Sequence, residues 1–204
     1  MKTQQFLKKF HEQKISTVVI GTSAGGVEAL RDLLPCFKAP SALSVALVIH
    51  LPPEGPNLLP SLYQEFCDYK IKEADSSETM IPGTIYIAPP DYHLSLEKDK
   101  TLSLSVESPL NYSRPSIDIL FESAGYALGD KCMGILLTGA NGDGSRGLQV
   151  INSKKGLTIV QDPEDAEYPT MPESAIGLFD PDLILSLEKI KKLITQITKE
   201  NTKE

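Results

Sequence analysis

A strand, a sharp turn and a helix are predicted near the N-terminus, and this unit constrains the fold more than any other stretch. The apolar, β-branched run at residues 17–20 predicts a strand, and residues 27–34 have the spacing of a helix. Residues 21–26, between them, read Gly-Thr-Ser-Ala-Gly-Gly. A second apolar run at residues 45–49 makes this the start of a βαβ unit with a right-handed crossover.

The turn itself contains the pattern G-x-S-x-G, centred on Ser23. In this pattern a serine is held on a tight turn, with its hydroxyl lifted above the end of a parallel sheet. Gly21 and Gly25 lack a Cβ, so the chain can bend steeply and a substrate can come close to the backbone. The amides of Ala24, Gly25 and Gly26 open the following helix, where a developing negative charge is favoured. Ser23 is therefore a candidate nucleophile.

The same turn also fits interpretations without a nucleophile. A glycine-rich connection between a strand and a helix, with no chemical role, agrees with the same residues. Two phosphate-binding loops fit less well: the glycines at 21, 25 and 26 do not match G-x-G-x-x-G, and no Lys-Ser/Thr pair follows as a P-loop requires.

Composition indicates one ordinary globular domain. The 204 residues are enough for one substantial core, with 41% hydrophobic and 23% charged residues. A net charge of −7 argues against a nucleic-acid surface, because binding to phosphates depends mainly on Lys and Arg. The polar N-terminus has no apolar signal region and no apolar run reaches 18 residues, so we expect a cytoplasmic protein without membrane insertion.

The cysteines predict neither a disulfide framework nor a zinc site. They are odd in number, far apart in the chain and form no C-x-x-C pair. We expect Cys36, Cys67 and Cys132 to be buried, reduced thiols.

Strands and helices alternate along the rest of the chain. This order predicts an α/β fold with a doubly wound, mostly parallel sheet in a three-layer α/β/α arrangement, plus an added β-hairpin around residues 94–106. We expect the domain to cover residues 15–198, with a short extension at 1–14 and a frayed tail at 199–204. Further strands are predicted at residues 84–88, 133–137 and 157–160, and further helices near residues 58–66, 114–129, 148–151, 172–178 and 187–197.

Four polar residues follow closely after different predicted strands. Ser23, His50, His93 and Asp143 should all reach the carboxyl edge of the sheet, where ligands bind in folds of this class. A serine hydroxyl needs a base to take its proton, and a histidine suits that task at neutral pH. His50 directly follows its strand and is the better base candidate than His93.

An acid that orients the histidine would complete the set. Asp143 lies in a glycine-rich loop and is well placed, while Asp91 and Asp162 are rivals. A lone histidine after a strand and an Asp-Gly pair are also common structural features, so the pattern alone leaves the set open. The order Ser, His, Asp differs from that of α/β-hydrolases, which indicates a different hydrolase fold.

At these residues the sequence resembles the chemotaxis protein-glutamate methylesterases, the CheB family, from about residue 15 to 185. Several separated motifs carry the resemblance, in order and at family-like spacing. They lie at residues 20–30, 48–52, 82–89 leading to His93, 114–118, 136–144, 161–163 and 171–175.

The resemblance implies a Ser-His-Asp hydrolase that removes methyl groups from glutamate side chains and releases methanol. Its substrate would be the cytoplasmic helices of a methylated chemoreceptor or a receptor-like protein, and some relatives also deamidate glutamine. Carried over by position, Ser23 is the nucleophile, His50 the base and Asp143 the orienting acid. The backbone N–H groups of Ala24 and Ala140 would form the oxyanion hole. No metal or cofactor is implied.

Three further residues are expected near the substrate, namely His93, Arg114 and Met171. The first two could equally be structural. The sequence departs from the family pattern at residues 140–142, where Ala-Asn-Gly replaces Met-Gly-x, at Thr170 in place of glycine, and at Ala24, where threonine is common. The departure at residues 140–142 implies an oxyanion-hole backbone of a different shape.

Regulation and competing functions follow from the same resemblance. Only about 14 residues precede the first predicted strand, so we expect no receiver domain in this chain and either constitutive activity or a separate regulator. The alternatives are a non-catalytic module of the same fold that binds receptors or signalling partners, and a small-molecule carboxylesterase.

Overall fold

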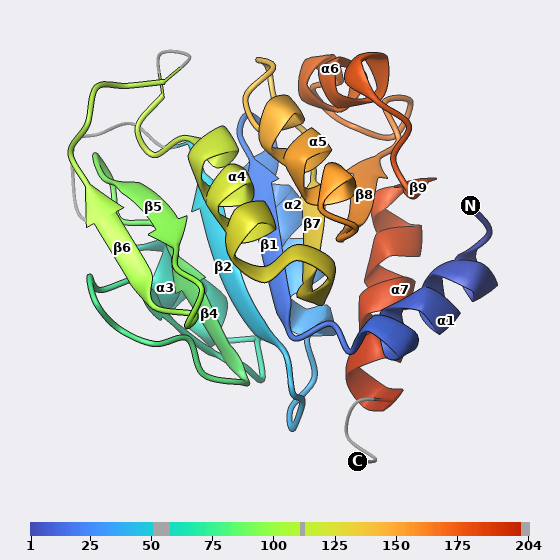
Figure 1. The fold of residues 1–204 in the computed structure, drawn as a ribbon, viewed down its shortest axis with the longest axis horizontal. Helices are drawn as coiled ribbons and strands as arrows, with labels where there is room; N and C mark the ends of the chain where they lie inside the picture. The colour runs from blue at the N-terminus through green and yellow to red at the C-terminus, as the bar shows by residue number, and fades with distance from the viewer. Residues whose placement is uncertain (51–57, 111–112, 201–204) are drawn as a thin grey trace.

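A parallel β-sheet forms the centre of the computed structural model, which describes residues 1–50, 58–110 and 113–200 (Figure 1). Within these residues the sheet has seven strands in the order β3-β4-β2-β1-β7-β8-β9, and every neighbouring pair is parallel. The strands are β1 (Thr17–Thr22), β2 (Ser44–Ile49), β3 (Lys70–Glu73), β4 (Thr84–Ile87), β7 (Cys132–Leu136), β8 (Leu157–Gln161) and β9 (Leu183–Leu185).

Helices cover both faces of the sheet, which confirms the predicted three-layer α/β/α architecture (Figure 1). One face packs against α1 (Thr3–Gln13), α2 (Gly26–Leu33), α3 (Leu59–Gln64), α7 (Leu187–Glu200) and the short η1 (Leu34–Cys36). The other face packs against α4 (Ile117–Leu128), α5 (Ser145–Ser153), α6 (Thr170–Leu178) and the predicted antiparallel hairpin of β5 (His93–Leu96) and β6 (Leu102–Ser105). A short 3-10 turn, η2 (Gly129–Lys131), connects α4 to β7.

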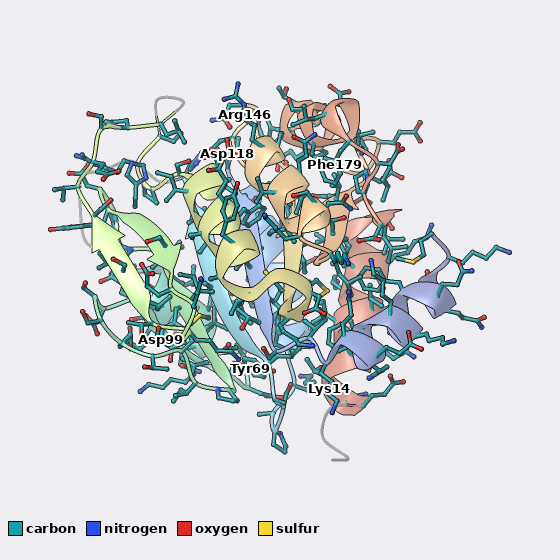
Figure 2. All side chains as sticks on the ribbon, viewed as in Figure 1. Lys14, Tyr69, Asp99, Asp118, Arg146 and Phe179 are labelled. Carbon is teal, nitrogen blue, oxygen red and sulfur yellow. The ribbon has the colours of Figure 1, made fainter. Side chains whose placement is uncertain are left out.

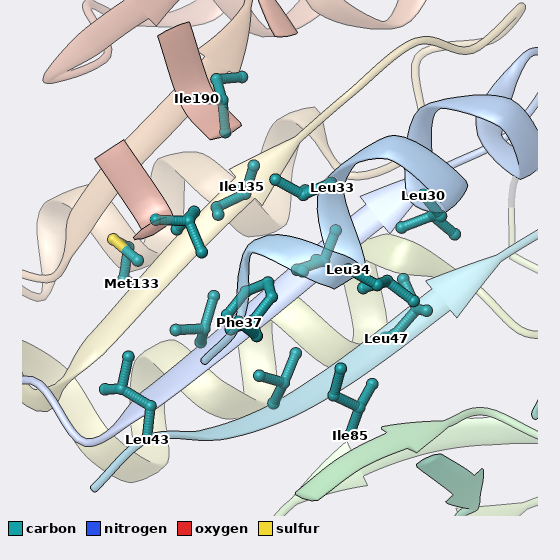
Figure 3. Packing of buried hydrophobic residues seen from close by; sticks show 14 of the residues in the cluster. Leu30, Leu33, Leu34, Phe37, Leu43, Leu47, Ile85, Met133, Ile135 and Ile190 are labelled. Carbon is teal, nitrogen blue, oxygen red and sulfur yellow. The ribbon is translucent and has the colours of Figure 1, made fainter. Parts of the chain in front are cut away.

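The central strands are apolar because both of their faces are buried. Every residue of β1, β2, β7 and β8 is buried, as expected for a parallel sheet with helices on both sides. Side chains alternate between two cores: Val18 and Ile20 join the core beneath α2 and α7, and Val19 joins the core beneath α4. Figure 3 shows Leu33 of α2 packed toward Ile135 of β7.

Two short strands, β3 and β9, were not predicted. Both are at the edges of the sheet and pair with one neighbour each. Ile71 is the one buried residue of β3, so this strand lacks the continuous apolar run of a central strand. Helices α5 and α6 also begin two or three residues before the predicted apolar positions, because their first turns lie at the polar carboxyl edge.

The two ends of the chain differ in part from expectation. Phe6 and Phe10, in the predicted extension, are buried in the same core as α7. Residues 199 and 200, predicted to fray, form the end of α7, and residues 201–204 lie outside the described part. Residues 51 and 52 of the predicted His-Leu-Pro motif also lie outside it. The domain boundaries at 15 and 198 remain a prediction.

Two expectations concern thiols and membranes. Cys67 and Cys132 are buried free thiols as predicted, but Cys36 is only half-buried, because it lies at the end of η1 beside α7. Among the residues that the structure describes, no helix has both the length and the apolar character needed to cross a membrane.

Gly144 is required where α4 meets α5. It has a φ of 90°, and an added Cβ would lie 2.6 Å from Cγ2 of Ile117 and 2.7 Å from Cδ1 of Leu136. We expect Gly144→Ala to lower the free energy of unfolding by about 3 kcal/mol, from left-handed strain and overpacking together. Urea denaturation measures this change.

Gly177→Ala is the matched control, because a Cβ at this exposed position in α6 would meet no atom within 4 Å. It should leave stability unchanged or raise it by up to about 1 kcal/mol, since alanine favours a helix. Equal stabilities of the two variants would contradict the packing argument at Gly144.

Candidate active site at the carboxyl edge of the sheet

The order of the strands brings three predicted residues together. Strand β1 lies between β2 and β7, so the loops that follow these strands meet at one edge, at the top of Figure 1. Ser23 directly follows β1, His50 directly follows β2, and Asp143 lies in the loop between β7 and α5. The backbone N–H of Ser23 donates to the carbonyl oxygen of Thr138 at 3.0 Å, which joins the first and third of these loops.

A chain of hydrogen bonds connects the three side chains. Ser23 Oγ lies 3.2 Å from Nδ1 of His50, and Nε2 of the same ring lies 2.9 Å from Oδ2 of Asp143. Because the carboxylate only accepts, Nε2 must carry the proton of the neutral ring, which leaves Nδ1 free to accept from the serine hydroxyl. These nitrogen roles are the reverse of those in chymotrypsin. The arrangement can deprotonate a serine and stabilise the resulting imidazolium.

Asp143 is fully buried and accepts four hydrogen bonds. Oδ2 accepts from His50 and from the backbone N–H of Ile117 at 2.7 Å. Oδ1 accepts from the Ser116 hydroxyl at 2.9 Å and from the N–H of Asp118 at 3.1 Å. The last three donors form the N-terminus of α4, whose helix dipole also favours a negative charge.

The charge state of Asp143 follows from this environment. Burial, the largest single effect, would raise the pKa of its carboxyl, but the hydrogen bonds from His50, Ile117 and Asp118 together outweigh it and lower the pKa below the usual value. Asp143 is therefore ionised at neutral pH and can hold the His50 ring in one tautomer.

Asp118 forms the reciprocal contact between the two helices. Its Oδ1 accepts from the backbone N–H of Gly147 at 2.8 Å, in the first turn of α5. The start of α4 thus donates to Asp143, which lies two residues before α5, and the start of α5 donates to Asp118 of α4. Figure 2 shows Asp118 at the N-terminal end of α4, beside α5. Burial is the largest effect on Asp118 and, with the charge of Asp143 nearby, raises its pKa to about 6.

A pH-dependent effect on stability is expected at Asp118. Since folding raises the pKa of this carboxyl, its stabilising contribution is complete below the ordinary value near 4 and is lost as the pH rises through 6. Asp118→Asn stays neutral, so its stability relative to the native chain should increase between pH 4 and pH 8, by at most about 3 kcal/mol. Urea denaturation across this range measures the difference, and a constant difference would contradict the assignment.

Thr138 fixes the turn that carries Ser23. Its hydroxyl donates to the carbonyl oxygen of Ala24 at 3.0 Å and accepts from the N–H of Tyr168 at 2.9 Å. Gly25 has a φ of 75°, and a Cβ there would lie 3.1 Å from the Thr138 hydroxyl oxygen. The turn is therefore held from the loop after β7, a contact that no local sequence signal revealed.

Two backbone amides are predicted to bind the oxyanion, and their hydrogen bonding differs from that of the nearby Gly26 amide. In the described part of the chain, the N–H groups of Ala24 and Ala140 have no hydrogen-bond acceptor. The N–H of Gly26, also expected to favour negative charge, already donates to the carbonyl oxygen of Ser23 at 2.8 Å. The N–H of Asp143 donates to the Asn141 side chain at 3.1 Å, which fixes the loop that departs from the family pattern. A role of Ala24 and Ala140 as donors remains a prediction.

The three residues expected near the substrate are engaged within the protein. His93 is 1% exposed, and both of its ring nitrogens have backbone partners. Arg114 donates to the carboxylate of Asp91 and to two carbonyl oxygens of the loop after β6. Met171 is fully buried against Gly139. Their roles in substrate binding stay predictions.

The rival acids have other partners, and two serines were missed. Asp91 pairs with Arg114 at 2.6 Å, and Asp162 accepts from the N–H of Glu164 in its own turn. Ser116 contacts Asp143, and Ser113 Oγ lies 3.5 Å from Nδ1 of His50. The Arg-Pro-Ser motif was a sequence signal for Ser116. Its role at Asp143 was missed, because a serine directly before a helix is usually interpreted as an N-cap residue.

No metal site accompanies this arrangement in the residues described. There, no three His, Cys, Asp or Glu side chains are grouped so that they could hold an ion.

Comparison with known proteins decides the family. Residues 18–194 match the profile of the family described as "CheB methylesterase". The chain belongs to the CheB methylesterase family. The crystal structure of the Thermotoga maritima CheB methylesterase catalytic domain superposes with a TM-score of 0.85 at 28% sequence identity, over 90% of this chain and 98% of that one. The predicted fold and family are confirmed.

Two sequence relatives named as methylesterases differ in length. A Leptospira interrogans protein named "Putative protein-glutamate methylesterase/protein-glutamine glutaminase" is 43% identical over 92% of this chain and 97% of its own length. A Paraburkholderia xenovorans protein named "Protein-glutamate methylesterase/protein-glutamine glutaminase" is 34% identical over 91% of this chain. The chain spans 52% of that second protein's length.

Proposed function

We propose that this CheB family member is a protein-glutamate methylesterase in which Ser23, His50 and Asp143 are the catalytic residues. The observation that carries the proposal is the continuous hydrogen-bonded chain from Ser23 Oγ through both His50 ring nitrogens to Asp143. The names of the relatives support the same activity.

The reaction begins with acyl transfer to the serine. Ser23 Oγ attacks the carbonyl carbon of the glutamate methyl ester while His50 Nδ1 takes its proton. The tetrahedral intermediate collapses, and the methoxide leaves as methanol with the proton from Nδ1. Asp143 remains ionised throughout and stabilises the imidazolium through Nε2. The product of this half is a glutamyl ester of Ser23.

Hydrolysis of that ester completes the cycle. A water molecule gives a proton to His50 Nδ1 and attacks the acyl carbon, and collapse returns the proton to Ser23 Oγ. The glutamate carboxylate is released. In both halves the oxyanion is bound by the N–H groups of Ala24 and Ala140, and loss of one such donor typically costs on the order of a hundredfold in rate.

A glutamine deamidase activity follows from the same chemistry. The side-chain amide of glutamine offers a carbonyl carbon in the same place, and the leaving group becomes ammonia instead of methanol. The name of the Leptospira relative includes this activity. The amide is a poorer acyl donor, so the deamidase should be slower than the esterase.

The proposed substrate is the methylated cytoplasmic helices of a chemoreceptor or a receptor-like protein, which places the reaction in the cytoplasm. The names of the relatives support a protein glutamate ester as substrate. The chemoreceptor is what the resemblance to the CheB family implies.

Methanol release tests the proposal. The purified chain is mixed with the cytoplasmic fragment of a methylated chemoreceptor, or with a free glutamate methyl ester, and methanol is measured over time. We expect a much higher kcat/KM on the receptor. Release from the free ester alone would indicate a small-molecule carboxylesterase, and no release by folded protein would indicate a binding module.

A further inference from the structure

His93 belongs to a second chain of hydrogen bonds that ends at Asp143. It is the first residue of β5, and its side chain reaches the start of α4. The backbone N–H of Ser116 donates to Nδ1 of His93 at 3.1 Å. The Ser116 hydroxyl in turn donates to Oδ1 of Asp143 at 2.9 Å. His93 is thus two hydrogen bonds from the carboxylate that holds His50.

The contacts determine the proton position on His93. Because an N–H points at Nδ1, that nitrogen must be unprotonated. Nε2 then carries the proton and donates to the carbonyl oxygen of Ser108 at 3.3 Å. The ring is buried with 1% exposure, so water does not replace either partner easily. A neutral ring in this tautomer ties α4 to the loop that follows the hairpin.

The start of α4 is itself unusual. Ser116 occupies the N-cap position, but its side chain makes no cap hydrogen bond to its own helix. The Asp143 carboxylate takes that place, because it accepts from the N–H groups of Ile117 and Asp118. Donors from three consecutive residues, 116 to 118, therefore set the position of Asp143. His93 bonds to the first of these residues, Ser116.

We propose that His93 is a positioning residue for the esterase reaction: its neutral ring fixes the first residues of α4, and these fix the Asp143 carboxylate against His50. The proposal rests on the proposed function for its kinetic consequence. In the described part of the chain the His93 ring bonds to Ser108 and Ser116, and not to Ser23 or His50, so we assign it no proton transfer in the reaction. Its effect is geometric, and a displacement of about 1 Å in a catalytic group costs on the order of a hundredfold in rate.

Three substitutions of His93 test the contributions of its two ring nitrogens separately. His93→Asn puts an amide oxygen near the place of Nδ1, so it keeps the acceptor for Ser116. His93→Gln places its amide near Nε2, so it keeps the donor to Ser108 and loses that acceptor. His93→Leu removes both. We expect kcat per folded protein to stay within a few-fold of the native value in the Asn variant. It should fall roughly 10- to 100-fold in the Gln and Leu variants, with KM little changed.

Proton NMR gives a readout that needs no activity. The proton between His50 Nε2 and Asp143 resonates far downfield when that bond is short and protected. Its signal should keep the native position in His93→Asn and shift or broaden in His93→Gln. Circular dichroism verifies folding, and the Asn and Gln pair decides the question even if His93→Leu does not fold.

Two results would overturn the inference. One is an equal loss of kcat and an equally changed downfield signal in the Asn and Gln variants, and the other is a native kcat and a native signal in all three variants. If the native chain released no methanol, the proposed function would fail, but the NMR comparison of Asn and Gln would still decide whether His93 positions Asp143.

Discussion

Ser23→Ala is expected to abolish methanol release from a methylated receptor. Without Oγ no acyl-enzyme forms, and only the oxyanion donors and substrate binding remain. In subtilisin the loss of the nucleophile costs about 10⁶-fold in kcat, and we expect a loss of at least about 10⁴-fold in this protein. Methanol measured at equal protein concentration gives the ratio.

Folding should be little affected by this change. Ser23 is half-buried and its hydroxyl bonds to His50, so the backbone of the turn keeps its bond to Thr138 in the variant. Ser61→Ala, at an exposed position of α3, is the matched control and should retain native activity. If the Ser23 variant kept a tenth of native activity, another nucleophile would have to be sought.

Asp143→Asn should produce the second largest loss, on the order of 10⁴-fold in kcat, as the corresponding change does in chymotrypsin-type enzymes. An amide has only one acceptor oxygen. If its NH₂ group faces His50 and Ile117, it meets two donors; if it is turned, it meets the N–H of Asp118. The His50 tautomer is then no longer held, and Nδ1 loses its role as base.

Stability should also fall in this variant, by about 1 to 3 kcal/mol, because a buried N–H at the start of α4 is left without an acceptor. Steady-state kinetics and urea denaturation on the same sample separate the two effects. Asp180→Asn, exposed in the loop after α6, is the matched control. A loss of less than tenfold in kcat would remove Asp143 from the proposed mechanism.

Much of the fold was predictable because its central strands are buried on both faces. Such strands need continuous apolar runs, and those at residues 17–20, 45–49, 84–88, 133–137 and 157–160 were all recognised. The edge strand β3 was not predicted because it buries only one side chain, that of Ile71. Strand β9 was not predicted because three residues are too few to show the alternation of side chains in a strand.

The residues alone determined that Ser23, His50 and Asp143 follow three different strands, because glycines and polar residues interrupt the apolar runs there. Only the tertiary structure decided that these strands are neighbours, since the order of strands in a sheet depends on how the helices pack on its two faces. The contact of His50 with Asp143, and not with Asp91 or Asp162, has the same origin, and so do the contacts of the two His50 nitrogens. The burial of His93 against α4 was equally invisible, because residues 93 and 116 are joined by folding and not by local pattern.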